Sequence, residues 1–142
     1  MRIGKLAKEA GVGVETVRFY QQKGLMAQPP KPETGGYREY PAESVHRIRF
    51  IRSAQQIGFS LGEIDELLEL EAGNNTRCID VRKRAEVKLE DVLVKIDNLK
   101  SIRKALEMLI NACPGKGSVR KCSILEAINS GDIRLKPVKN GE

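Results

Sequence analysis

The sequence has few aromatic residues and no tryptophan. Aromatic residues make up 4% of the 142 residues, whereas hydrophobic residues as a whole reach 40%. Leu, Ile, Val and Ala therefore supply most of the apolar surface, and these are the residue types that pack helices together. This composition predicts an all-α protein, and the length suits one globular domain with an appendage.

Long apolar runs are also lacking. No stretch approaches the ~20 apolar residues that cross a bilayer, and the N-terminal residues Met-Arg-Ile-Gly-Lys lack the apolar core of a secretory signal. We therefore expect a cytoplasmic protein. The three cysteines are an odd number and lie far apart, so we expect reduced thiols rather than a disulfide framework.

The positive charge is concentrated in the N-terminal part of the chain. The formal net charge is +6, and residues 1–60 carry ten Lys and Arg against five Asp and Glu, whereas residues 61–142 carry fifteen against fourteen. A localised basic patch suits contacts to nucleic-acid phosphates, but many basic domains bind no nucleic acid. Charge alone therefore leaves DNA binding open.

Two short helices separated by a glycine turn are predicted at the N-terminus. Apolar residues recur at helical spacing over residues 3–10, and the glycines of residues 11–13 interrupt the period. A second helix follows and stops at Gly24. This pattern is typical of a helix-turn-helix. The residues of the second helix that we expect to face outward are Thr16, Arg18, Tyr20 and Lys23.

A loop and a short strand are expected next. Residues 29–36 hold three prolines and two glycines, which excludes regular structure. Residues 36–40, GYREY, alternate at strand spacing and predict one arm of a small β wing beside the helix-turn-helix. Tyr37 and Arg38 are candidate DNA contacts on this wing.

Two further helices should complete the N-terminal domain. The first opens at Pro41 and ends at Gly58, with the three arginines Arg47, Arg49 and Arg52 outside its apolar stripe. Ser60 followed by Glu63 is the pattern of a capping box for the second.

A single long helix is predicted from about Arg77 to Ala112. This segment contains neither Gly nor Pro, and apolar residues recur at alternating spacings of three and four from Ala85 to Leu109. Roughly 35 residues give a helix about 50 Å long, which is too long to bury its stripe against a small domain. The sequence therefore predicts a homodimer in which a second copy covers this stripe.

The cysteines lie at the ends of this helix and in the loop after it. Cys78 and Cys113 should be about 50 Å apart within one chain. If two such helices pair antiparallel, Cys78 of one chain lies beside Cys113 of the other, and the short loop lets Cys122 fold back toward Cys113. This arrangement would give two identical three-thiolate sites per dimer.

Three thiolates form a soft site, which selects mercury(II), cadmium(II), lead(II), copper(I) or zinc(II) over magnesium or calcium. Zinc is disfavoured because it usually takes four ligands, and the single histidine, His46, lies on the Arg-rich helix. Two other interpretations stay open. Free cysteine is a common small buried residue, and the basic residues of the loop could make the thiols a redox switch.

Three segments carry a resemblance to a known family. The segments that carry it are IGKLAKEAGVGVETVRFYQQKGL, GGYREY and VHRIRFIRSAQQIGFSLGEIDELLEL. The chain resembles the MerR family of bacterial regulators, and the resemblance covers nearly the whole chain. It implies a winged helix-turn-helix that binds an inverted repeat between the two promoter elements, and an antiparallel dimer of the long helices. It also implies that the metal-free protein represses, and that metal binding activates RNA polymerase by bending and untwisting an overlong promoter spacer.

The spacing of the cysteines is similar to that in mercury-sensing members of the family. The resemblance implies that Cys78, Cys113 and Cys122 hold one mercury(II) ion per site, with two sites per dimer. In the copper(I) branch a serine stands at the position of Cys78, and zinc sensors add a cysteine or histidine near the loop. Cadmium(II) and lead(II) sensors, which also use three cysteines, remain as alternatives.

The resemblance also implies contacts to DNA. Thr16, Arg18, Tyr20, Tyr37 and Arg38 match the family's contact positions, and Lys23 and Arg47 are expected to contact phosphates.

The resemblance and the cysteine pattern weigh against other functions. A redox sensor with an iron–sulfur cluster would need four closely spaced cysteines. A thiol enzyme would need an acid or base beside the cysteines, so we do not expect an enzyme. A multidrug regulator would need a large effector domain, and only about 30 residues follow the long helix.

We therefore expect four regions along the chain. They are a winged helix-turn-helix DNA-binding domain over residues 1–70, a linker and dimerisation helix over 71–112, a metal-binding loop and short helix over 113–130, and a flexible tail over 131–142.

Overall fold

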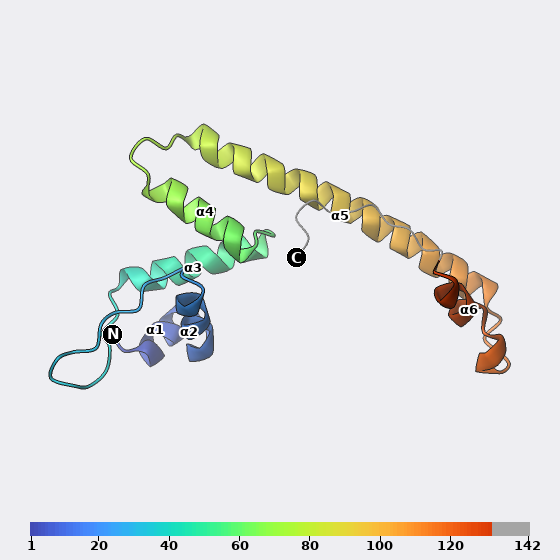
Figure 1. Ribbon diagram of the computed structural model, residues 1–142, viewed down its shortest axis with the longest axis horizontal. Helices are drawn as coiled ribbons and strands as arrows, with labels where there is room; N and C mark the ends of the chain where they lie inside the picture. Colours follow the sequence, from blue (N-terminus) through green and yellow to red (C-terminus); the bar gives the residue numbers. More distant parts are fainter. Residues whose placement is uncertain (132–142) are drawn as a thin grey trace. The chain divides into compact units, whose positions relative to one another are not determined.

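The computed structural model describes residues 1–131, in which α-helices are joined by loops (Figure 1). The expected tail, from residue 132 onward, lies outside the described residues. The chain divides into two compact units, Met1–Arg84 and Ala85–Glu142. The helices are α1 (Ile3–Ala10), α2 (Val14–Gln22), α3 (Glu43–Gln56), α4 (Leu61–Ala72), α5 (Cys78–Ala112), the 3₁₀ turn η1 (Val119–Lys121) and α6 (Ser123–Ser130).

The hydrophobic core of the first unit lies among its N-terminal helices. Helix α1 packs against α2 and α3, and α3 packs against α4. Each helix contributes apolar residues at helical spacing, and full burial of one such side chain stabilises the fold by ~1.5–3 kcal/mol. The fully buried side chains are Leu6, Val17, Leu25, Ile48, Ile51 and Ile64.

Glycine and arginine together form the turn of the helix-turn-helix. Gly11 adopts a φ of 74° and closes α1 by donating from its backbone N–H to Lys8. From α3, Arg49 donates to the carbonyl of Glu9 at 3.2 Å, and Arg52 donates to the carbonyl of Gly11 at 2.9 Å. These guanidinium groups satisfy carbonyls that the end of α1 leaves without a helical partner. Part of the basic face of α3 therefore has a structural role.

The expected strand at residues 36–40 does not form, and residues 1–131 contain no β-strand. The segment is extended, and Tyr40 exchanges backbone hydrogen bonds with Met1, at 2.7 Å from its N–H and 2.9 Å to its carbonyl. A strand needs a ladder of repeated pairs with a neighbour, and one exchanged pair does not make such a ladder. The prediction of a small β wing is therefore wrong for the described residues, and this segment is a loop.

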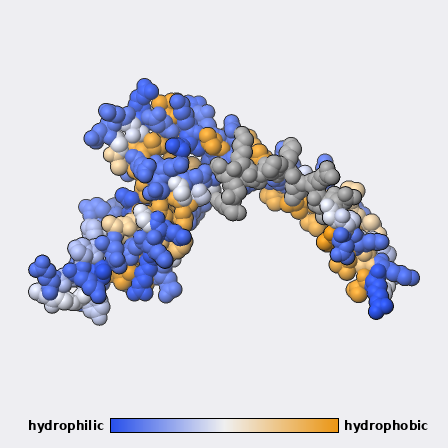
Figure 2. Space-filling model, viewed as in Figure 1, coloured by the Kyte–Doolittle hydropathy of each residue, from blue (hydrophilic) through white to orange (hydrophobic). Residues whose placement is uncertain are grey.

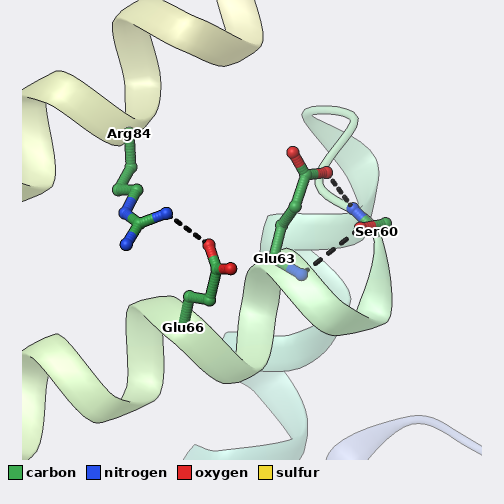
Figure 3. A network of polar contacts seen from close by, with 4 residues as sticks. All are labelled: Ser60, Glu63, Glu66 and Arg84. Carbon is green, nitrogen blue, oxygen red and sulfur yellow. Dashed lines mark hydrogen bonds and ion pairs between the residues drawn. The ribbon is translucent and has the colours of Figure 1, made fainter. Parts of the chain in front are cut away.

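The capping box predicted at the start of α4 is confirmed (Figure 3). The N–H of Glu63 donates to Ser60 Oγ at 3.3 Å, and the N–H of Ser60 donates to the Glu63 carboxylate at 2.8 Å. Glu66, one turn further along α4, accepts from Arg84 at the start of α5 with an N–O distance of 2.6 Å. Both side chains of this ion pair are about half exposed, so it contributes little to stability.

Helix α5 is continuous over 35 residues, as the lack of Gly and Pro predicted. Its apolar residues are largely uncovered within one chain, and Figure 2 shows them as hydrophobic surface along the helix. The leucines Leu89, Leu93, Leu99 and Leu106 are each more than half exposed. Such a continuous apolar surface is typical of a helix that packs against another chain.

Candidate nucleic-acid interface and metal centre

A hollow of about 610 Å³ lies where α2 faces the loop before α3. We call it the basic hollow, because four cations line it and no carboxylate of the described residues does. The cations are Arg2, Arg18, Lys31 and Arg38, and the rest of the lining includes glutamines and Tyr37. Concentrated positive charge beside amide side chains suits the phosphates and base edges of a nucleic acid.

Three of the predicted DNA contacts line this hollow together. Arg18 comes from α2, whereas Tyr37 and Arg38 come from the loop before α3. Arg38 also donates from Nε to the carbonyl of Pro29 at 2.8 Å, which holds this side chain against the loop. The loop thus has the position expected of a wing without forming a strand.

Tyr20 does not face outward, so the predicted orientation of this residue is wrong. Its side chain is 3% exposed, and its hydroxyl donates to Gln55 Oε1 on α3 at 2.9 Å. Val17 and Tyr20 are three residues apart on α2, so they share the face that packs into the core. Burial raises the pKa of Tyr20, and the charge of Arg52 opposes part of that shift.

The other predicted contacts lie outside the basic hollow. Thr16 is half-buried in the first turn of α2, and Lys23 is exposed with its Nζ 5.6 Å from the centroid of the Phe19 ring. Arg47 donates to the carbonyl of Leu25 at 3.1 Å and lines a second hollow beside Pro41. These residues remain predicted contacts.

Arg2 and Lys31 line the basic hollow, but the sequence did not identify them as candidate DNA contacts. The guanidinium of Arg2 lies over the ring of Tyr37, with 4.2 Å from its carbon to the ring centroid. Both residues lie outside regular helices, and the fold of the first unit brings them to the hollow that Arg18 lines. The basic excess of the first sixty residues was the only sequence signal for them.

Two of the three thiols share a small cavity in the second unit. Cys113 and Cys122 line a space of about 190 Å³, which we call the thiol cavity. Among the described residues, its lining consists of residues 113–119 and 121–123. The loop therefore folds back as expected, so that Cys113 and Cys122, nine positions apart in sequence, line the same cavity.

The 3₁₀ turn η1 brings the chain back to Cys122. Ser118 begins this turn and accepts from the N–H of Arg120 at 3.3 Å. Cys122 is the N-cap of α6, and its carbonyl accepts from the N–H of Glu126 at 3.0 Å. Ser123 is the first helical residue of α6 and does not occupy its N-cap position.

Cys78 is exposed and is the first residue of α5, whereas Cys113 follows the last residue of that helix. The two thiols are therefore at opposite ends of α5, as predicted. Among residues 1–131 of one chain, no group of three or more His, Cys, Asp or Glu side chains is placed to hold a metal ion. The thiol cavity therefore offers two ligands.

The chemistry of the thiol cavity suits a soft, thiophilic ion. The described residues that line it include no carboxylate and no imidazole, so sulfur is its only strong metal-binding side-chain donor. Lys116 and Lys121 also line it, and their charge would offset that of metal-bound thiolates. The only histidine, His46, is on α3 in the first unit.

The described helices include none that is both long and apolar enough to span a membrane.

Family matches cover most of the chain. The family described as MerR HTH family regulatory protein matches residues 1–71, and the family described as MerR, DNA binding matches residues 45–109. The mercuric resistance operon regulatory protein of Pseudomonas fluorescens is 44% identical over 131 residues, which cover 92% of this chain and 89% of the relative.

Two metal-bound structures are similar in fold. The lead(II) complex of the transcription regulator PbrR691 from Ralstonia metallidurans CH34 has a TM-score of 0.79 and 33% identity, covering 90% of this chain and 98% of the other. The mercury(II) complex of MerR from Bacillus megaterium MB1 has a TM-score of 0.66 and 36% identity, covering 91% and 99%.

Proposed function

The chain belongs to the MerR family of helix-turn-helix regulatory proteins, and we propose that it represses its promoter without metal and activates it on binding mercury(II). It is a metal-responsive transcriptional regulator, as its curated relatives are, and not an enzyme. The mercuric resistance regulators among these relatives, at 44% and 39% identity, support mercury(II) as the effector.

The observation that carries this proposal is the shared cavity of Cys113 and Cys122. Two sulfurs without a carboxylate or imidazole form part of a site for a soft ion. We propose that Cys78 of a second chain supplies the third thiolate, with α5 pairing antiparallel in a homodimer. The uncovered leucines of α5 support such pairing, and the twofold axis would then create two equal sites.

The DNA-binding part of the proposal rests on the basic hollow. Arg18, Tyr37 and Arg38 would contact the operator there, with Arg2 and Lys31 adding phosphate contacts. Thr16, Lys23 and Arg47 stay predicted contacts outside the basic hollow. A dimer carries two such hollows, which suits the two halves of an inverted repeat.

Activation would work through the shape of the promoter. If metal binding changes how the two DNA-binding units are held, the DNA between them bends and untwists, and the bound RNA polymerase can start transcription. Metal binding would then control how strongly the DNA is deformed, and the contacts to the bases need not change.

Lead(II) or cadmium(II) is the second candidate effector. The lead(II)-bound relative has the higher TM-score of the two metal complexes, and three thiolates suit either ion. A thiol redox switch is a weaker alternative.

A competition titration tests the choice of ion. The reduced protein is titrated with mercury(II), cadmium(II), lead(II) and zinc(II) against a thiol buffer, and transcription from the operator is measured in parallel. We expect mercury(II) to bind most tightly and to activate at the lowest free concentration. Activation by lead(II) or cadmium(II) at a lower free concentration than mercury(II) would reassign the effector.

A further inference from the structure

The hydroxyl of Ser123 has no hydrogen-bond partner although its oxygen is buried. Ser123 lines the thiol cavity together with Cys113 and Cys122. A buried polar group without a partner is costly, and such groups are rare in native proteins. The position of this one points to a ligand in the cavity.

The neighbouring serines differ from Ser123 because the hydroxyl oxygen of each has a hydrogen-bond partner within the protein. Ser118 lines the same cavity, and its Oγ accepts from the N–H of Arg120. Ser130, at the end of α6, donates to the carbonyl of Ala127 at 2.7 Å. The N-cap position, where a serine oxygen would accept from the helix, is occupied by Cys122.

Loading of the proposed metal site would create acceptors for this hydroxyl. A divalent ion held by three thiolates leaves one net negative charge, which is spread over the sulfurs. Metal-ligand atoms in proteins are commonly held by hydrogen bonds from residues around them. The amine groups of Lys116 and Lys121 supply positive charge, but among the side chains lining the cavity Ser123 carries the buried donor without a partner.

We propose that Ser123 is a positioning residue of the metal site, whose hydroxyl donates a hydrogen bond to a metal-bound thiolate sulfur. The inference rests on the proposed function, because it requires a thiophilic ion at Cys113 and Cys122. It assigns Ser123 no role as a metal ligand. In this role the Ser123 hydroxyl stabilises the metal-loaded protein and does not stabilise the metal-free protein.

Two properties should therefore respond differently to Ser123→Ala. In the metal-free dimer, loss of an unpaired buried hydroxyl should leave the unfolding temperature unchanged or raise it. In the loaded dimer, loss of the hydrogen bond should weaken mercury(II) binding by about tenfold, the lower end of the range for such supporting residues. The energy of the sulfur-to-metal charge-transfer absorption should also shift, because the hydrogen bond lowers the electron density on sulfur.

The test compares four full-length reduced dimers with mercury(II) chloride as the probe, in competition with a thiol buffer. They are the native protein, Ser123→Ala, Ser123→Thr and the matched control Ser118→Ala, whose hydroxyl already has a partner in the same cavity. We expect Ser123→Thr to retain native affinity, because it keeps the hydroxyl. Ser118→Ala should lower metal-free stability and leave the charge-transfer energy unchanged.

The outcomes separate this inference from the proposed function. Native affinity and an unshifted absorption in Ser123→Ala would overturn the role of Ser123 while the metal site stands. A fall in metal-free stability of Ser123→Ala that accounts for its lower affinity would also overturn it, by making the serine structural. Failure of the native protein to compete for mercury(II) would instead overturn the proposed function, and this inference with it.

Discussion

The guanidinium carbon of Arg2 lies 4.2 Å from the centroid of the Tyr37 ring. This cation–π contact connects the residue before α1 with the loop before α3, and both residues line the basic hollow. The contact therefore fixes a cation at the surface where DNA is proposed to bind.

Replacing Arg2 should weaken DNA binding without changing its sequence preference. If Arg2 contacts a phosphate, Arg2→Ala lowers affinity for operator and unrelated duplex alike, and the slope of log K against log salt falls by about one. Fluorescence anisotropy at several salt concentrations measures both quantities. Arg103→Ala, which breaks an exposed ion pair with Glu107 on α5, is the control. An unchanged salt slope for Arg2→Ala would contradict a phosphate contact.

Arg18→Ala should weaken operator binding by roughly tenfold or more, because this exposed arginine of α2 faces the basic hollow. The stoichiometry of mercury(II) should not change, since the thiol cavity is formed by other residues. Operator titrations and metal titrations on the same preparation test the two parts. An equal fall in metal binding would show that the two functions are not separable in this way.

Tyr20→Phe should lower the stability of the fold and spare DNA binding. The change removes the hydrogen bond to Gln55, whose loss costs about 1 kcal/mol of unfolding free energy. Urea unfolding and operator binding at low temperature measure the two effects. If Tyr20→Phe lowers DNA affinity while the stability stays native, Tyr20 is a DNA contact after all.

The pH dependence of stability provides a second check on Tyr20. Burial raises the pKa of this phenol above its ordinary value of 10.0, so the unfolded chain loses the proton first as pH rises. Native stability should therefore fall with pH from about 10 up to the raised pKa. Tyr20→Phe should make this decline shallower.

Leu99→Lys should shift the protein toward monomers. Leu99 is 63% exposed within one chain, and a dimer through α5 would cover it in both copies. Loss of ~1.5–3 kcal/mol of burial per chain raises the dissociation constant by at least about tenfold. Sedimentation at micromolar concentration tests this, with Lys100→Ala as a neighbouring control. Unchanged sedimentation of Leu99→Lys would place the dimer interface elsewhere.

The helix-turn-helix and the long helix could be predicted from the sequence because their signals are local. Apolar spacing and the glycines around residue 11 define α1 and α2, and the lack of Gly and Pro defines α5. The spacing of Val17 and Tyr20 was also a usable signal, and it would have placed Tyr20 in the core.

The predictions that failed concern segments whose structure depends on residues distant in the sequence. Alternation over five residues is compatible with a strand or an extended loop, and only a pairing strand decides between them. The basic hollow depends on how the loop packs against α2.

We propose that each metal site takes Cys78 from one chain and Cys113 with Cys122 from the other. Cys78→Ala and Cys113→Ala homodimers should each lose both tight sites, because every site then lacks one thiolate. In a heterodimer of these two variants, one site keeps all three thiolates and the other keeps only Cys122.

Metal stoichiometry on purified, differently tagged heterodimers, measured under strong thiol competition, distinguishes a shared site from a site formed within one chain. The shared site predicts about one tightly bound mercury(II) ion per heterodimer, although neither parent homodimer holds one. A site formed within one chain predicts no recovery, because each chain is defective by itself. A heterodimer without a tightly bound ion would therefore contradict the shared-ligand arrangement.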